Sequence, residues 1–349
     1  MQVGLITGQE QIELKEFSDP VAEAGQAVVE VSHCGICGTD LHAFHTGSPY
    51  NPAICGHEWA GTVSAVGHDV RGIREGDRVG VGVPSACGQC TECRGGDATH
   101  CEYVLSGMLA VGPFSTPYGG FAPSLAVNAE RLYPVHAKLT DEDAALLEPA
   151  TVAVHAVRRT PIALGDTVVV LGAGPIGLLV LQCARASGAG CAVMIEPAPD
   201  RRRLASELGA TAVIDPTTED VEARVREECG PRGADVVFEC AGIPKTIDQA
   251  VTLSRRGGIM SLVGLASLPA EIKPGNWLVK EVRVIASLGY LREEFDHTMQ
   301  LVADGRLRLD LLHSRTIGLS EMDSAFRSLI ANEGDVKVLV DPRRSGLND

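Results

Sequence analysis

The sequence predicts an α/β protein of two domains, a mostly-β domain followed by a doubly wound parallel sheet. Three observations support this fold class. The chain has 349 residues, which is about twice the usual size of one domain. Short β-branched runs separated by Gly and Pro fill roughly the first 150 residues, and strands alternate with helices after Asp141.

In the first domain, helix signals are scarce. Runs such as Ala27–Val31, Gly61–Gly67 and Asp77–Val81 combine β-branched residues with glycine turns, which predicts irregular β structure. The acids at the start of Asp141–Leu147 favour the first turn of a helix, so we expect a helix to begin there.

From Thr167 onward, apolar strands alternate with helices. Strands are expected at Thr167–Leu171, Ala192–Ile195, Ala212–Ile214, Ala234–Glu239, Gly258–Val263 and Val282–Ser287. Helices are expected at Ile176–Ser187, Asp200–Leu208, Val221–Cys229 and Lys245–Ser254. This alternation indicates a parallel sheet with crossover helices on both faces. Two further helices, Glu294–Asp304 and Met322–Ile330, and a strand at Val336–Val340 complete the chain.

Composition excludes several classes of function. There are 30 basic and 45 acidic residues, a net charge of −15, and no basic run, so nucleic acid and anionic membranes are not expected partners. The uncharged stretches Val104–Ala129 and Thr167–Ala184 are interrupted by Gly and Pro, which argues against membrane spans. The first ten residues lack the features of an export signal, so we expect a cytoplasmic protein.

The eleven cysteines favour metal binding over disulfides in a reducing compartment. Four of them are spaced C-x2-C-x2-C-x7-C, namely Cys87, Cys90, Cys93 and Cys101. Four thiolates saturate a tetrahedral ion, which predicts a structural zinc site. An iron–sulfur cluster has similar ligand spacing and remains the alternative.

A second set of potential ligands lies outside the four-cysteine motif. His33–His42 is followed by Gly56–Gly61, and the two segments offer a thiolate, imidazoles and carboxylates. Three such ligands and one open position would form a Lewis-acid site. The alternative is that each of these residues has an ordinary structural role.

A glycine-rich turn follows the strand Thr167–Leu171. Gly172, Gly174 and Gly177 form G-x-G-x-x-G before a helix, the pattern of a turn that binds a pyrophosphate. Glu196 follows the next strand, where a carboxylate can bind the adenosine ribose hydroxyls, and this favours NAD over NADP. Arg201–Arg203 leave NADP open, since a nearby Arg can accommodate its 2′-phosphate.

With these motifs in this order, the whole chain resembles the zinc-dependent medium-chain dehydrogenase/reductase family, and within it the polyol, threonine and butanediol dehydrogenases. Further landmarks are Gly76–Val79, Glu148–His155, Phe238–Gly242 and Val336–Val340. The resemblance implies a GroES-like catalytic domain at 1–150 with a structural zinc lobe at about 84–103. It also implies a Rossmann NAD-binding domain at 151–288 and a C-terminal segment, 289–349, that returns to the catalytic domain. The cofactor and substrate would meet in the interdomain cleft.

The resemblance also implies roles for individual residues. Cys37 and His57 match catalytic zinc ligands, Glu58 binds that metal directly or through water, and Glu148 lies where polyol-type enzymes have a Glu. Thr39 and His42 match a proton relay. The expected cofactor-binding residues are Gly172, Gly174, Pro175, Ile176, Gly177, Glu196, Arg201, Val263, Gly264, Leu265, Gly289 and Tyr290. Two zinc ions per chain are expected.

These roles predict an NAD-dependent enzyme that oxidises a secondary alcohol or polyol to a ketone. The alternatives are an NADPH-dependent carbonyl reductase of the same fold and a non-catalytic zinc-binding structural protein. The loop Tyr50–Cys55 is shorter than in butanediol dehydrogenases. Candidates for the substrate pocket are Phe44, His45, Trp59, Phe114 and Leu291. A homodimer or homotetramer is expected if Val282–Ser287 is an edge strand.

Overall fold

The computed structural model describes residues 1–47 and 51–344, so Tyr50, where the short predicted loop begins, lies outside the described residues. The chain folds into two compact units. Unit 1 contains Met1–Glu148, Tyr290–Ala303 and the segment from Leu309 onward, and unit 2 contains Pro149–Gly289 and Asp304–Arg308. From the sequence we expected all of residues 289–349 to belong to the catalytic domain, but Asp304–Arg308 belongs to unit 2. Gln182 holds it there, because its Oε1 accepts the N–H of Arg308 at 2.7 Å.

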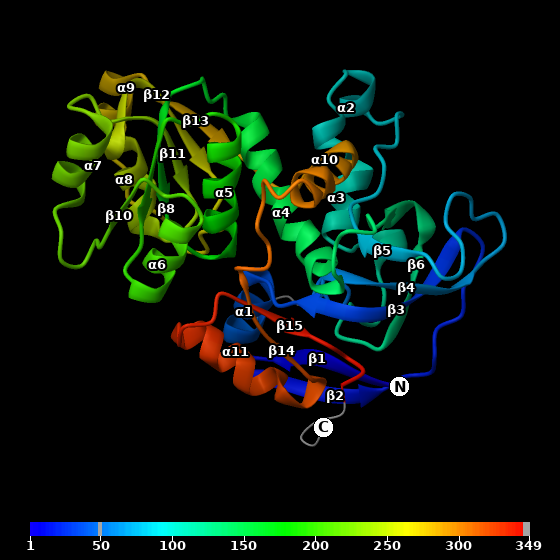
Figure 1. Ribbon diagram of the computed structural model, residues 1–349. Coiled ribbons are helices and arrows are strands. Elements are labelled where there is room, and N and C mark those ends of the chain that lie inside the picture. Colours follow the sequence, from blue (N-terminus) through cyan, green and yellow to red (C-terminus); the bar gives the residue numbers. More distant parts are fainter. Residues whose placement is uncertain (48–50, 345–349) are drawn as a thin grey trace. The chain divides into compact units, whose positions relative to one another are not determined.

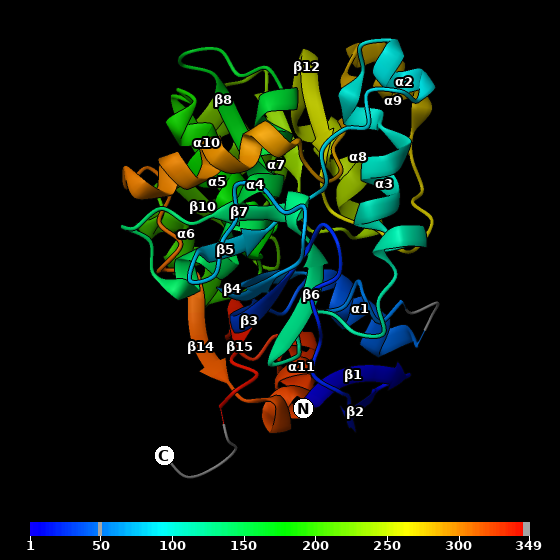
Figure 2. The same ribbon diagram turned by 90° about the vertical axis from the view of Figure 1, so that its right-hand side faces the viewer.

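Unit 1 contains a mixed sheet whose strands run in the order β14-β15-β3-β4-β5-β7, and β6 also pairs with β3. The bounds of these strands are β3 Gln26–Gly35, β4 Glu58–Val66, β5 Arg78–Val81, β6 Ser124–Asn128, β7 Leu132–Pro134, β14 His313–Ile317 and β15 Lys337–Val340. A separate hairpin is formed by β1, Gln2–Gly8, and β2, Gln11–Glu16. The late strand β15 lies antiparallel to β3, with Leu339 opposite Gly35, so the C-terminal segment lies beside the N-terminal strands (Figure 2).

The helices of unit 1 include several that the sequence did not predict. Their bounds are α1 Gly38–Thr46, α2 Thr91–Arg94, α3 Glu102–Met108, α4 Asp141–Arg159, α10 Arg292–Ala303 and α11 Met322–Ala331; the boundary between the units falls within α4. Helix α1 is too short for a clear apolar period. It is set instead by its first turn, where the Asp40 carboxylate accepts the N–H of Cys37 at 2.8 Å.

Phe44 lies in the core of unit 1, so its assignment to the substrate pocket was wrong. It is fully buried and makes an edge-to-face contact with Phe326 of α11, with ring centroids 5.3 Å apart. An apolar residue on the inner face of a short helix serves to pack that helix onto its neighbours. His45, the next residue, is exposed at the surface.

Unit 2 is built on a parallel sheet with strand order β10-β9-β8-β11-β12-β13. Its strands are β8 Thr167–Leu171, β9 Cys191–Ile195, β10 Ala212–Ile214, β11 Ala234–Glu239, β12 Ser254–Leu262 and β13 Arg283–Ala286. Its helices are α5 Pro175–Ala186, α6 Pro199–Glu207, α7 Val221–Cys229, α8 Pro244–Leu253 and α9 Pro274–Lys280 (Figure 1). This is the doubly wound order in which the direction of winding reverses between the first and fourth strands, here β8 and β11.

One predicted boundary in unit 2 was wrong. The helix expected at Lys245–Ser254 ends at Leu253, and β12 begins at Ser254 rather than at Gly258. Ser254 is fully buried and pairs with Ala234 of β11. Its carbonyl oxygen also accepts a hydrogen bond from Lys280 at 2.7 Å. These tertiary contacts outweigh the local helical pattern.

None of the helices in the described part of the chain is long and apolar enough to cross a membrane. The stretches Val104–Ala129 and Thr167–Ala184 fold instead into short helices, strands and turns within the two units.

Asp235 is a hydrogen-bonding centre at the start of the unit 2 sheet. Its Oδ2 accepts the N–H and hydroxyl of Thr167 at 2.9 and 2.7 Å, and its Oδ1 accepts Nε of Arg255 at 2.6 Å. Burial acts to raise the pKa of Asp235, but these donors outweigh burial and lower it. The carboxylate therefore links β8, β11 and β12.

We expect Asp235→Asn to destabilise unit 2 by about 1–2 kcal/mol at neutral pH, since it weakens charge-assisted hydrogen bonds at a partly exposed site. The folded-state pKa lies below the unfolded one, so this contribution is present above the unfolded pKa, about 4, and is lost as pH falls through the folded value. Urea unfolding followed by Trp277 fluorescence in a Trp59→Phe background measures it. Asp200→Asn, at an exposed surface pair, is the control, and an equal loss in that variant would contradict the role of Asp235.

Candidate metal and cofactor sites

The four-cysteine motif converges on one point. The sulfur atoms of Cys87, Cys90, Cys93 and Cys101 all lie within 4.8 Å of one another. The motif follows β5, and Cys90 and Cys101 stand immediately before α2 and α3. Short turns between the first three cysteines therefore bring their side chains together.

Backbone N–H groups point at the sulfurs of this cluster. The N–H of Cys87 lies 3.3 Å from Sγ of Cys101, and the N–H of Cys90 lies 3.4 Å from Sγ of Cys87. Burial acts to raise the pKa of Cys101, but N–H donors from Cys87 and Val104 and the neighbouring thiols lower it to about 6. Thiolates held in this way fit a tetrahedral soft cation with no open position.

A second cluster forms where β3 ends and β4 begins. Cys37 lies between β3 and α1, His57 precedes β4, and Glu58 is the first residue of β4. One ligand atom from each lies within 4.8 Å of the other two. A thiolate, an imidazole and a carboxylate are a suitable ligand set for zinc with one position left open.

The imidazole of His57 is oriented by the main chain. Its Nδ1 lies 2.7 Å from the carbonyl oxygen of Ile54, so Nδ1–H is the donor and Nε2 is left to face a cation. Burial opposes the charged form of His57, yet Cys37, Asp40 and Glu148 raise its pKa well above the usual value. This is the response of a titratable group to a strongly negative environment, which also favours a bound cation.

Asp40 lies within the segment that supplies Cys37 and was counted there only among the possible carboxylate ligands, with no role of its own. It is fully buried; its Oδ2 accepts the N–H of Cys37 at 2.8 Å, and its Oδ1 accepts that of Gly56 at 3.1 Å. One carboxylate thus holds both ligand-bearing loops. Burial raises its pKa, while His57 and the two N–H donors oppose that rise. Its position three residues after Cys37 at a helix start was the available signal.

Lys337 was also missed. Its Nζ lies 2.5 Å from Oε2 of Glu58 and 2.9 Å from the carbonyl oxygen of Ile36, and both charged side chains are 2% exposed. Burial opposes the charge on Lys337, but Glu58 and Cys37 raise its pKa. A Cβ atom at Gly35 would lie 2.2 Å from Oε2 of Glu58, so glycine at this position leaves room for the carboxylate.

Glu148, Thr39 and His42 lie around the Cys37 cluster. Glu148 is partly buried; desolvation raises its pKa to about 7, and it is hydrogen-bonded to Tyr290. It lies outside the group of mutually close ligand atoms. The hydroxyl of Thr39 lies 3.8 Å from Sγ of Cys37, and His42 is half-buried one turn further along α1, on the same side of the helix.

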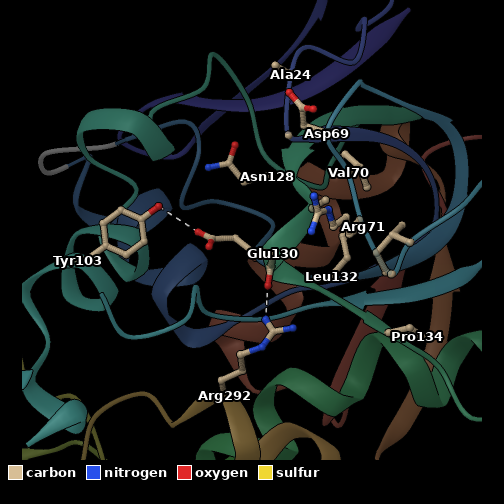
Figure 3. A pocket seen from close by; sticks show the side chains of 14 residues that line it. Ala24, Asp69, Val70, Arg71, Tyr103, Asn128, Glu130, Leu132, Pro134 and Arg292 are labelled. Carbon is tan, nitrogen blue, oxygen red and sulfur yellow. Dashed lines mark hydrogen bonds between the residues drawn. The ribbon is translucent and has the colours of Figure 1, made fainter. Parts of the chain in front are cut away.

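A small cavity of about 50 Å³ in unit 1 is lined by His57, Trp59 and Phe114 among others, so two of the pocket candidates from the sequence line the same cavity as a predicted metal ligand. A larger one, of about 500 Å³, is lined by charged side chains that include Arg71, Glu130 and Arg292 (Figure 3). No metal or cofactor residue predicted from the sequence lines the larger cavity.

In unit 2 the three motif glycines have different roles. Gly172 has φ +92°, and a Cβ there would lie 2.9 Å from Cα of Ala241. A Cβ at Gly177 would lie 1.8 Å from the carbonyl oxygen of Gly172, whereas nothing lies within 4 Å of one at Gly174. Gly174 is the N-cap of α5, and Pro175 and Ile176 form its first turn. The turn is therefore tight on two sides and open at the helix N-terminus, as a pyrophosphate site requires.

Glu196 directly follows β9 and is 4% exposed. Its Oε2 accepts the N–H of Ala173 at 2.7 Å and its Oε1 that of Ala198 at 2.9 Å, so it braces the glycine turn while each oxygen retains a further lone pair. Burial lowers the pKa of Arg201, and Glu196 opposes this. Arg202 is paired with Asp215 at 3.0 Å.

The segment Val263–Leu265 follows β12 and packs against Glu239. The N–H groups of Val263 and Gly264 donate to the Glu239 carbonyl oxygen at 2.9 and 2.8 Å. Oε1 of Glu239 accepts three hydrogen bonds, whereas Oε2 is buried without a partner in the described structure. This carboxylate lies at the carboxyl end of β11, beside the point where the winding reverses and dinucleotides bind. It was not predicted from the sequence.

The last two predicted cofactor residues are Gly289 and Tyr290. Gly289 has φ +64° and is the last residue of the main unit 2 segment. Tyr290 belongs to unit 1, where it is 4% exposed and packs near Phe295. Burial raises the pKa of its hydroxyl well above the usual value.

Comparisons with known proteins show the family of the chain. The model of the alcohol dehydrogenase GroES-like domain matches residues 23–137, and that of the zinc-binding dehydrogenases matches residues 175–304. The chain is 33% identical to (R,R)-butanediol dehydrogenase of Bacillus subtilis (strain 168), over 96% of this chain and 97% of that one. It is 34% identical to 2-dehydro-3-deoxy-L-galactonate 5-dehydrogenase of Pseudoalteromonas atlantica, over 91% and 92%.

Among solved structures, a zinc-binding dehydrogenase of Sinorhizobium meliloti 1021 bound to NADP superposes with a TM-score of 0.87 at 33% identity. The match covers 98% of this chain and 99% of that one. With its GroES-like and Rossmann domains, the chain therefore belongs to the zinc-dependent alcohol and polyol dehydrogenases of the medium-chain family and is an oxidoreductase that acts on CH–OH groups.

Proposed function

We propose that this enzyme oxidises a secondary alcohol of a polyol or sugar-acid substrate to a ketone with NAD. The observation that carries the proposal is the convergence of Cys37, His57 and Glu58, whose ligand atoms lie within 4.8 Å of one another in a partly buried, negatively charged site. Relatives named for a diol and for a sugar acid support a substrate with neighbouring hydroxyl groups.

Each residue has a distinct part in the proposed reaction. Cys37, His57 and Glu58 would hold the catalytic zinc, and Glu148 lies beyond them as a partly buried carboxyl group. Bound there, the metal would supply Lewis-acid polarisation of the substrate hydroxyl, and the nicotinamide would supply the hydride acceptor. Thr39, 3.8 Å from Cys37, receives the hydroxyl proton and passes it toward His42.

A screen of polyols, sugar acids, cyclic alcohols and hydroxy amino acids, followed by NADH absorbance, tests the proposal. We expect turnover to be highest with a polyol or sugar acid. The alternative is an NADPH-dependent carbonyl reductase of the same fold. It would be correct if the zinc-loaded enzyme oxidised none of the alcohols in the screen but reduced carbonyl compounds with NADPH.

We expect two zinc ions per chain by elemental analysis, one in each cluster. His57→Ala should retain one ion and lose turnover by about a thousandfold or more, because several kcal/mol of transition-state stabilisation depend on the metal. Cys93→Ser should instead lose the ion held by the four cysteines and lower the thermal midpoint of unit 1.

The matched control is Cys183→Ser, which removes a buried thiol of unit 2 far along the chain from both clusters. It should keep both ions. One ion per chain in the unsubstituted enzyme, or iron in the four-cysteine site, would refute this assignment.

We propose NAD rather than NADP because Glu196 lies at the end of β9 with free lone pairs for ribose hydroxyls, and a carboxylate repels a 2′-phosphate. The similar structure bound to NADP and Arg201 beside Glu196 favour the alternative cofactor. The carboxylate is the more buried group and is held against the glycine turn by the N–H of Ala173, so it should dominate.

We expect Glu196→Gln to raise the ratio of NADPH to NADH affinity by about tenfold, the equivalent of about 1.4 kcal/mol. Glutamine keeps a hydrogen-bond acceptor for the glycine turn but removes the charge. Fluorescence titration measures both affinities without relying on turnover. Arg203→Gln, which changes an exposed pair, is the control. A preference of the unsubstituted protein for NADP would sink the argument from Glu196.

We also propose that the enzyme works in a reducing compartment such as the cytoplasm, where thiols and zinc thiolates persist. We further propose that it forms a homo-oligomer assembled through β13. Strand β13 is last in the order of the sheet, so one side of its backbone has no neighbouring strand among residues 1–47 and 51–344. Val284 on this strand is 45% exposed, and Leu278, Val279 and Leu288 nearby in sequence are also exposed. An edge strand with apolar neighbours is suited to pairing with a second copy.

Val284→Asp should convert the assembly toward monomer in sedimentation velocity, because it places like charges opposite each other across the new pair. Val21→Asp, at an exposed position of unit 1, should leave the sedimentation coefficient unchanged. A monomeric unsubstituted protein would exclude assembly through this edge.

A further inference from the structure

Two cysteines outside the zinc clusters lie together in unit 2. Cys191 is the first residue of β9 and Cys229 the last residue of α7. Both are partly exposed free thiols, and Sγ of Cys191 lies 3.7 Å from the carbonyl oxygen of Glu228, the residue before Cys229. None of the roles described above uses either of them.

The sequence pattern brings these two thiols together. Alternate residues of a strand share a face, so Cys191 lies on the same side of β9 as Val193 and Ile195. On α7, Val221, Val225 and Cys229 are spaced four apart and form one stripe. Both sets pack in one apolar cluster. The first residue of β9 and the last residue of α7 therefore lie side by side, with Sγ of Cys191 against the backbone that precedes Cys229.

The surroundings distinguish the two sulfurs. Sγ of Cys191 lies 3.2 Å from the hydroxyl of Thr211 and 3.7 Å from the carbonyl oxygen of Glu228, and the contact with Thr211 is open to solvent. Burial, followed by the proximity of Cys191, raises the pKa of Cys229 to about 12, so that Cys229 keeps its proton at neutral pH. Cys191 is thus the thiol that meets a dissolved reagent first.

A metal site is the other use for paired thiols. Groups of three or more potential ligands in the described part of the chain are the two clusters already assigned, and neither contains Cys191 or Cys229. Two thiols without a third such ligand do not form a zinc site of the structural kind.

We propose that Cys191 and Cys229 form a reversible disulfide when the enzyme meets a peroxide. The Cys191 thiolate attacks one peroxide oxygen, the O–O bond breaks, and a sulfenic acid and a hydroxide result; the hydroxide takes up the proton that the Cys191 thiol released and becomes water. The Cys229 thiol then attacks the sulfenic sulfur, the S–O bond breaks, and a second water leaves with the remaining proton. In sum, two thiols and one hydrogen peroxide become one disulfide and two waters.

The position of the pair fits a modification that spares the active site. Strand β9 is next to the edge formed by β10, at the opposite end of the strand order from β13, so pairing through β13 leaves these thiols accessible. Cys191 begins β9, whereas Glu196 follows its other end. We therefore expect NADH affinity to change less than about twofold on oxidation.

The test treats the zinc-loaded enzyme with a small excess of hydrogen peroxide and blocks remaining thiols with N-ethylmaleimide. Trypsin then releases residues 186–201 and 227–232, each with one cysteine. We expect these two peptides joined, at a mass two hydrogens below their sum, and separated again by a phosphine reductant. Zinc content measured in parallel shows whether the metal clusters were oxidised instead.

Variants test the order of attack. Cys229→Ser should yield no joined peptide and should accumulate a dimedone adduct on Cys191, while the control Cys183→Ser should retain the joined peptide. The proposal is overturned if both thiols of the unsubstituted enzyme remain alkylated by N-ethylmaleimide at peroxide levels that release zinc. It is also overturned if residues 227–232 are joined to a peptide other than 186–201.

Discussion

The ion pair between Glu58 and Lys337 is the constraint on which the metal site of unit 1 depends. Two charges with 2% exposure are costly to bury unless each compensates the other, and removing one partner leaves an uncompensated charge. The pair also joins the first residue of β4 to the first residue of β15. Because β15 lies antiparallel to β3, the strand that carries Lys337 also borders the backbone that leads to Cys37. The glycine at position 35 is a consequence, since any side chain there would occupy the volume of the carboxylate.

Around this pair, the site is organised by main-chain contacts more than by its ligands. Asp40 joins the N–H groups of Cys37 and Gly56, and Ile54 orients the ring of His57. Unit 2 follows the same principle, because Glu196 holds the N–H of Ala173 and Glu239 those of Ala241 and Gly242. In both units a buried carboxylate fixes the loop that presents the functional groups. Such loops are rigid before a ligand arrives, which lowers the entropic cost of binding.

Much of this could be predicted from the sequence, and the rest fails for identifiable reasons. The sheet of unit 2 has strong periodicity, so its strands were found within a few residues, except where Lys280 and Ala234 draw Ser254 into β12. The four cysteines were evident from spacing because their contacts are local. Lys337 could not be found, since 279 residues separate it from Glu58 and a lysine in a strand has no signature of burial. Helix α1 was missed because it depends on Asp40 and on packing against Phe326 rather than on its own period.

The pairing of β15 with β3 also has a consequence for synthesis. Chains fold from the N-terminus as they leave the ribosome, and the main segment of unit 2, Pro149–Gly289, lies between Glu58 and Lys337 in the chain. That segment is therefore made, and can fold, before the lysine that neutralises Glu58 exists. Until then the carboxylate has only water or a metal ion to balance it. The nascent first domain is thus expected to be open at its metal site, and zinc can enter before β15 closes beside β3.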